Sequence, residues 1–140
     1  MKVVFESQED KVNYLKGLIR VAKCNGIVEP EEMEYFSLAA KKLKLDQESS
    51  SYIESLWHTK EKTDICFSSR YLAVFFMQEA FQLCIVDGTF DAEEKLEIAQ
   101  IGDELGISKE DRERIHSWIM EGMEWRRRGE ELVDEIAGEV

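Results

Sequence analysis

The chain has 140 residues, of which 44% are hydrophobic and 34% are charged, and its formal net charge is -12. This length and balance predict one soluble globular domain over residues 1–140, and the charge argues against a nucleic-acid partner because phosphates would be repelled. The beginning, MKVVFESQEDK, lacks the apolar run of a signal peptide, and the densest apolar run (residues 71–86) is too short to span a bilayer. We therefore expect a cytoplasmic protein without a membrane span.

Residues 7–60 have the pattern of three helices. Ser7 is a candidate N-cap, and the helix that it starts should end near Gly26, which adopts the left-handed conformation at low cost. Pro30 stands at the favoured first position of a second helix, and Asp46 caps a third. The residues expected to face the core are Val12, Leu15, Leu18, Ile19, Ala22, Met33, Phe36, Ala40, Leu43, Ile53, Leu56 and Trp57.

Residues 69–122 repeat this logic. Ser69 starts a helix that is apolar nearly all round, which predicts the most buried helix of the fold, and Asp87-Gly88 should end it. Asp91 begins the next helix as part of a capping box, and Ser108 caps a sixth. Apolar residues expected on the inner faces are Phe75, Phe76, Ala80, Phe81, Leu83, Ile98, Ile101, Leu105, Ile115, Ile119 and Met123.

The C-terminal extension, residues 123–140, holds a basic cluster and a short apolar segment. Residues 130–137 are expected to add a seventh helix, and the arginines at 126–128 to form a solvated helix face or an ion-pair site. The indole rings of Trp118 and Trp125 are expected to pack in the core. No alternating run supports a strand, so the predicted fold is all-α with about seven helices.

The two triplets are related by a shift of 62 residues. Under this shift Gly26 falls on Gly88, Glu32 on Glu94, and the helix-boundary residues of the first triplet fall on those of the second. No gap is needed between 7–60 and 69–122, and the linker at residues 59–67 is the only clear break. We therefore predict two pseudosymmetric three-helix repeats followed by a C-terminal helix.

The stretch DGTFDAEE, residues 87–94, has a structural and a chemical interpretation. Asp91 and Glu94 serve the helix start, but Asp87 lies at the negative end of a helix, which a bound cation would compensate. Calcium needs six to eight oxygens, more than one turn supplies, so a site would draw on both turns. Its candidate ligands are Asn25, Glu29, Glu32, Asp87, Asp91 and Glu94. A purely structural turn and a turn that also holds Ca²⁺ or another divalent cation both remain open.

These turns resemble those of the TerB-like (tellurite resistance protein TerB) domain family, whose pattern is helix-DGxΦxxxE-helix with Φ apolar. The second turn matches at Asp87, Gly88, Phe90 and Glu94, and the first turn, NGIVEPEE, matches at Gly26, Val28 and Glu32. The first turn departs from the pattern at Asn25, which removes one negative charge. The resemblance covers most of residues 7–122 and implies an all-helical fold, a divalent-cation site at the turns and a role in stress or tellurite response.

Other chemistry has little support in the sequence. The two histidines, His58 and His116, have no partner at catalytic spacing and are expected at the surface or half-buried. Cys24, Cys66 and Cys84 show no CxxC spacing and are expected to be reduced thiols, with Cys84 in the core. We therefore predict a non-enzymatic interaction or scaffold module whose partner is another protein, with a basic partner favoured by the net charge. The alternatives are a calcium-binding protein and, less supported, an enzyme using acid pairs.

Overall fold

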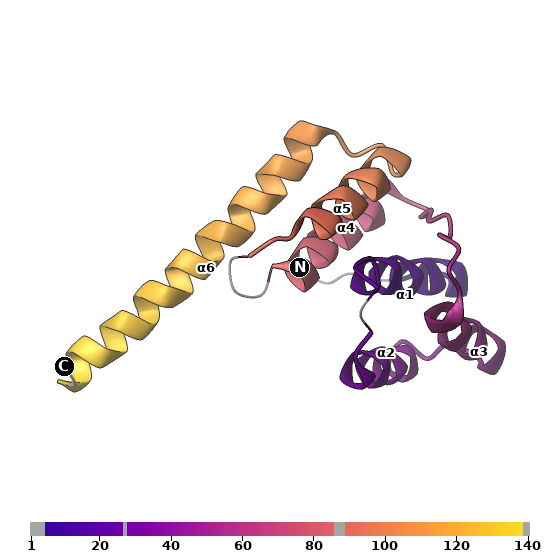
Figure 1. The fold of residues 1–140 in the computed structure, drawn as a ribbon, viewed down its shortest axis with the longest axis horizontal. Helices are drawn as coiled ribbons and strands as arrows, with labels where there is room; N and C mark the ends of the chain where they lie inside the picture. Colours follow the sequence, from indigo (N-terminus) through magenta and orange to yellow (C-terminus); the bar gives the residue numbers. More distant parts are fainter. Residues whose placement is uncertain (1–4, 27, 86–88, 139–140) are drawn as a thin grey trace.

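The computed structural model describes residues 5–26, 28–85 and 89–138, and this part of the chain is all-α (Figure 1). It contains six α-helices, one 3-10 helix and no strand, which confirms the predicted fold class. The elements are α1 (Gln8–Ala22), α2 (Pro30–Lys42), α3 (Gln47–Ser55), η1 (Leu56–His58), α4 (Arg70–Cys84), α5 (Ala92–Glu104) and α6 (Lys109–Ala137). None of these helices is long and apolar enough to cross a membrane.

The helix starts are set by local capping. In each of five helices, the N-cap side chain accepts a hydrogen bond from the backbone N–H three residues later; these caps are Ser7, Asp46, Ser69, Asp91 and Ser108. The exception is α2, where Glu29 makes no side-chain cap bond and Pro30 occupies the first position. The predicted caps are thus confirmed, because a cap depends only on residues a turn away.

The helix bounds recur at a constant distance along the chain. The helices α4, α5 and α6 each begin 62 residues after α1, α2 and α3, respectively. The first two pairs also agree in length, with 15 residues in α1 and α4 and 13 residues in α2 and α5. The helix starts therefore keep the 62-residue spacing noted in the sequence.

The core is centred on α4, which packs against α1, α5 and α6. Phe76, Met77 and Ala80 are fully buried on this helix, as its all-round apolar sequence predicted. The helix α1 approaches α4 closely at Gly17, where an added Cβ would lie 2.4 Å from Cε1 of Phe76. Packing around α4 therefore fixes the position of both triplets.

The segment between the triplets is held to α1 by polar side chains that the sequence analysis did not identify. The carboxylate of Asp10 accepts hydrogen bonds from the backbone N–H and the hydroxyl of Ser68. Nearby, Oδ1 of Asn13 accepts a hydrogen bond from the backbone N–H of Cys66, at 3.2 Å. Asp10 and Asn13 are both buried. The predicted linker is therefore anchored to α1.

The expectation of about seven helices is wrong, because α6 continues to Ala137 as one helix. Within it, Arg127 pairs with Glu124 and Glu131, one turn before and one turn after. Such ion pairs stabilise a helix across the point where a break was expected. The helix ends only at Gly138, whose φ is 74°.

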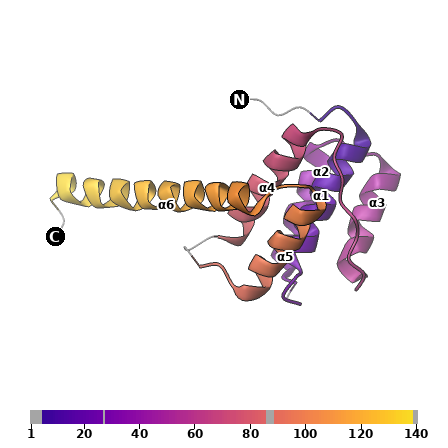
Figure 2. The same cartoon turned by 90° about the horizontal axis from the view of Figure 1, so that it is seen from above.

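The predicted core packing of two tryptophans is also wrong. Trp118 is 51% exposed and Trp125 is 77% exposed. Figures 1 and 2 show that the C-terminal part of α6 extends away from the other helices. The basic cluster on the same part of α6 is exposed, as predicted.

Candidate functional site

A pocket of about 530 Å³ opens beside the two acidic turns, and we call it the turn pocket. It lies among the end of α1, the start of α2, the end of α4 and the start of α5. Its apolar members are Val21, Ala22, Tyr35, Phe36 and Leu83, and its polar members are Asn25, Glu29, Glu31, Glu32, Cys84 and Glu94. The pocket therefore combines an apolar surface with several carboxylates.

The turn pocket brings together four of the six residues that the sequence suggested as cation ligands. Asn25, Glu29 and Glu32 come from the first turn and α2, and Glu94 comes from α5. Asp91 is not among the lining residues, and Asp87 and Gly88 lie outside the described residues. Residues more than 60 positions apart in the chain therefore line one pocket.

Asp91 and Glu94 perform the structural task that the sequence predicted for them. The Asp91 carboxylate accepts a hydrogen bond from the backbone N–H of Glu94 at 2.8 Å, and the Glu94 carboxylate accepts one from the backbone N–H of Asp91 at 3.3 Å. The hydrogen bond from the Glu94 N–H is the largest cause that holds the pKa of Asp91 below its ordinary value. At both residues, a capping box engages the carboxylate.

Burial changes the acidity of two carboxylates in the turn pocket. It raises the pKa of Glu94, with a further rise from the Asp91 side chain, and it is the largest cause of the raised pKa of Glu32. Both groups therefore hold their negative charge at some cost, which a bound cation or a basic side chain would reduce. Within the described part of the chain, however, no three His, Cys, Asp or Glu side chains are grouped closely enough to hold a metal ion.

The two cysteines near the turns have thiols of raised pKa. Burial and nearby carboxylates raise the pKa of Cys24 to about 11, and burial followed by the charge of Glu94 raises that of Cys84. Since the thiolate is the form that attacks electrophiles and binds metals, neither sulfur is prepared for such chemistry at neutral pH. Cys84 is buried, as predicted.

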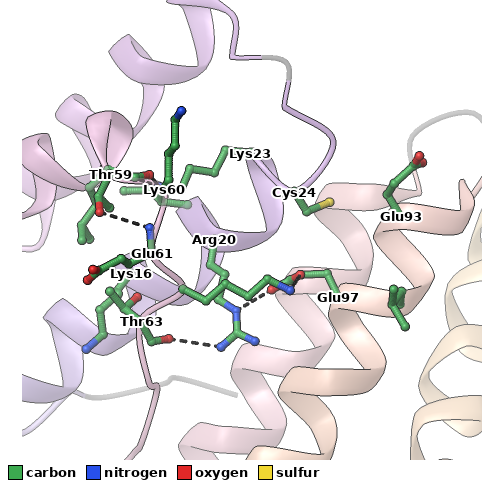
Figure 3. A pocket seen from close by; sticks show the side chains of 14 residues that line it. Lys16, Arg20, Lys23, Cys24, Thr59, Lys60, Glu61, Thr63, Glu93 and Glu97 are labelled. Atoms are coloured by element: carbon green, nitrogen blue, oxygen red, sulfur yellow. Dashed lines mark hydrogen bonds and ion pairs between the residues drawn. The ribbon is translucent and has the colours of Figure 1, made fainter.

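A second pocket, of about 250 Å³, surrounds Arg20 on α1 (Figure 3). The buried Arg20 guanidinium donates a hydrogen bond to Glu97 on α5 at 2.5 Å. It also donates two hydrogen bonds to Glu104, at 2.8 and 3.1 Å, in a bidentate ion pair. It also donates to the backbone carbonyl of Thr63, at 3.1 Å, and Lys62 pairs with Glu97 at 2.9 Å. Arg20 therefore joins α1, α5 and the linker.

The charged groups of this ion-pair network have hydrogen-bond partners within the network. Burial opposes the charge of Arg20, but the hydrogen bonds to Glu104 and Glu97 outweigh it and raise the pKa of the guanidinium. Sequence analysis missed the network, although Arg20 stands between Ile19 and Val21 in an apolar run. A charge flanked by apolar neighbours was the one available signal. The arrangement is structural, because the guanidinium is already engaged by its partners.

The two histidines lie in different surroundings. His116 is half-buried and its ring stacks on Phe81 and meets the edge of Phe90, while His58 is exposed. These positions confirm the expectation of surface or half-buried rings.

Comparison of the chain with models of known protein families, with curated proteins and with solved structures finds no significant match.

Proposed function

We propose that this chain is a non-enzymatic, cytoplasmic interaction module of TerB-like type, with a role in stress or tellurite response. In this proposal its two triplets are related by an internal pseudo-twofold axis, and its turn pocket binds a basic segment of another protein. The observation that carries the proposal is the composition of the turn pocket, where carboxylates stand beside an apolar surface between the two turns that resemble the TerB-like pattern.

The chemistry of the turn pocket favours a partner that is both basic and apolar. Tyr35 is 63% exposed and offers an aromatic face, while Glu29 and Glu31 are exposed beside it. A lysine or arginine flanked by an apolar residue meets both requirements, because its stem covers apolar surface while its head meets carboxylate. The net charge of -12 adds long-range attraction for such a segment.

The test uses two synthetic helical peptides of equal apolar content, one rich in lysine and one rich in glutamate. Fluorescence anisotropy should detect binding of the lysine-rich peptide only. The double variant Glu29→Lys with Glu31→Lys should weaken this binding at least about tenfold. The matched control is Glu54→Lys with Glu130→Lys, which changes the net charge equally at exposed sites away from the pocket. Equal loss in both variants would show attraction by net charge alone and would reject the turn pocket as the site.

A divalent-cation site is the second candidate, favoured by the four predicted ligands that line the turn pocket. Calorimetry with calcium should then release heat that falls in Glu32→Gln with Glu94→Gln. The raised pKa values of these two glutamates predict stronger calcium binding as the pH rises, because protons and the cation compete for the same carboxylates. Heat no greater than that of buffer would reject this candidate and leave the peptide proposal standing.

A further inference from the structure

The C-terminal half of α6 carries apolar side chains that nothing in the described fold covers. Every residue from 124 to 138 is exposed, including Trp125 at 77%, Val133 at 65% and Ile136 at 78%. Large apolar side chains gathered on one exposed helix are typical of an interaction surface. An isolated helical segment of this length is also marginal in water, so a partner would stabilise it.

Much of this apolar surface forms a single stripe with heptad spacing, which we call the α6 stripe. Steps of four and three residues alternate along it, as at the a and d positions of a coiled coil, and its members are Trp118, Gly122, Trp125, Gly129, Leu132 and Ile136. The face of α6 that packs on the other helices, through Ile119 and Met123, lies about a third of a turn away. The α6 stripe is therefore open along its length.

The order of residues in the α6 stripe is self-complementary. Its first four members alternate large and small, as Trp118, Gly122, Trp125 and Gly129. When a second α6 is laid alongside in the opposite direction, Gly122 faces Trp125 of the second copy and Trp118 faces Gly129. Twofold symmetry makes each of these contacts occur twice. Each indole then lies over a glycine, which leaves space for the ring. Leu132 lies beside Ile115, which is half-buried against the core.

We propose that α6 forms an antiparallel homodimer through the α6 stripe, with the indoles of Trp118 and Trp125 packed over the glycines of the second copy. The proposal concerns a surface distinct from the turn pocket and does not depend on the function proposed there.

A hollow in the surface supports this arrangement. A pocket of about 280 Å³ lies between the end of α4 and α6, and Gly122, Trp118 and Ile119 are among its lining residues. No atom lies within 4 Å of the position that a Cβ of Gly122 would take. In the antiparallel pairing, Trp125 of the second copy lies over Gly122 and its indole enters this hollow. Aromatic rings seated in such hollows provide much of the energy of many interfaces.

Charges beside the α6 stripe agree with the same pairing. The flanking positions next to the stripe are occupied by Arg114, Glu121, Arg128 and Glu135, whose signs alternate. In the antiparallel register, Glu121 faces Arg128 of the second copy and Arg114 faces Glu135. Both contacts join opposite charges, and each occurs twice by symmetry. In this structure Arg114 is exposed and contacts Asp111 at 3.2 Å within its own helix.

A parallel pairing fits the α6 stripe poorly. It would place Gly122 against Gly122 and Trp125 against Trp125. Layers whose side chains leave a cavity would then alternate with layers whose side chains clash. It would also place Arg128 beside Val133 rather than Glu121. The opposite face of α6 carries the network of Arg127 with Glu124 and Glu131, which is typical of a solvated surface. The pattern therefore selects one face and one direction.

Sedimentation equilibrium on the full chain gives the first test. The wild type should approach twice its 16.3 kDa mass as concentration rises, with a blue shift of tryptophan emission as the indoles leave water. Trp125→Ala should weaken dimerisation at least about a hundredfold. Its unchanged far-ultraviolet circular dichroism in dilute solution would show that the monomer still folds. A wild type that stays monomeric to about 1 mM, or a Trp125→Ala dimer of wild-type affinity, would overturn the proposal.

A charge-reversal cycle tests the register. Glu121→Arg and Arg128→Glu should each weaken dimerisation about tenfold, because each places like charges at two symmetric contacts. The double variant restores both pairs and should return to within about threefold of the wild type. Glu130→Arg, exposed and away from the α6 stripe, is the matched control and should have little effect. If the wild type dimerises but the double variant stays as weak as the single variants, the antiparallel register is overturned. A wild type that binds lipid vesicles or an unrelated helix but not a second copy of itself would also overturn the proposal.

Discussion

The helices α3 and α6 begin at equivalent positions of the two triplets, yet α3 has nine residues and α6 has 29. Each starts at a capped residue, Asp46 for α3 and Ser108 for α6, and each cap accepts a hydrogen bond from the N–H three residues later. The two helices therefore begin for the same local reason and differ only in how they end.

The difference arises after the second turn of each helix. In the first triplet the chain passes into η1, where Leu56 and Trp57 are buried, and then into the segment that Asp10 and Asn13 hold. In the second triplet, the residue equivalent to Leu56 is Trp118, which is 51% exposed. A helix start is thus decided by residues within one turn, whereas a helix end depends on whether the following residues can pack against the rest of the fold.

The largest expected effect comes from breaking the ion pairs that join the triplets. Arg20→Ala should lower the free energy of unfolding by about 3–5 kcal/mol, because the buried Glu97 would be left with Lys62 as its one ion-pair partner among the described residues. Urea denaturation followed by circular dichroism measures this loss. The residue equivalent to Arg20 in the second triplet is the exposed Gln82, and Gln82→Ala should change the free energy of unfolding by less than about 0.5 kcal/mol. Comparable losses in both variants would contradict the assignment of Arg20 as the link between α1 and α5.

The sequence predicted those parts of the fold that depend on near neighbours. The caps Ser7, Asp46, Ser69, Asp91 and Ser108 were identified to the residue, because each acts on a backbone group three positions away. Apolar spacing likewise identified the buried faces of α1 to α5, since only one side of a helix can face the other helices, whereas on α6 it wrongly included Trp118.

Contacts between distant residues were not predictable in this way. Arg20 and Glu97 are separated by 77 residues, and nothing in either local pattern specifies the other. The length of α6 was not predicted, because ion pairs around Arg127 continue the helix into the residues expected to form a separate seventh helix. For the candidate site, the capping role of Glu94 could be predicted from its neighbours in the chain. The grouping of four of the six proposed ligands in one pocket depends instead on how the two triplets pack.

An exchange at one position would test the difference between α3 and α6 directly. Leu56→Trp should lower the free energy of unfolding by about 1–3 kcal/mol, because Leu56 is only 5% exposed and an indole would overfill the core. Trp118→Leu, at the equivalent position, should change it by less than about 0.5 kcal/mol in dilute monomer. Urea denaturation at low protein concentration measures both. If Trp118→Leu lowered the free energy of unfolding more than Leu56→Trp, the interpretation of position 56 as buried and position 118 as exposed would be wrong.

The smallest expected effect lies at the turn that precedes each of these helices. Lys44 and Gly106 occupy equivalent positions with positive φ angles of 58° and 71°, and each donates its N–H to the carbonyl three residues earlier. Lysine is strained there and glycine is not. Lys44→Gly should therefore raise the free energy of unfolding by about 0.5–1 kcal/mol, and Gly106→Ala should lower it by about 1 kcal/mol.

No atom lies within 4 Å of an added Cβ at Gly106, so backbone strain is the only cause of the loss expected for Gly106→Ala. Thermal unfolding of both variants beside the wild type measures the two changes under one set of conditions. Changes of the same sign would mean that the two turns are not equivalent. Opposite signs of similar size would show that the triplets share the conformation of the turn and differ in the residue that adopts it.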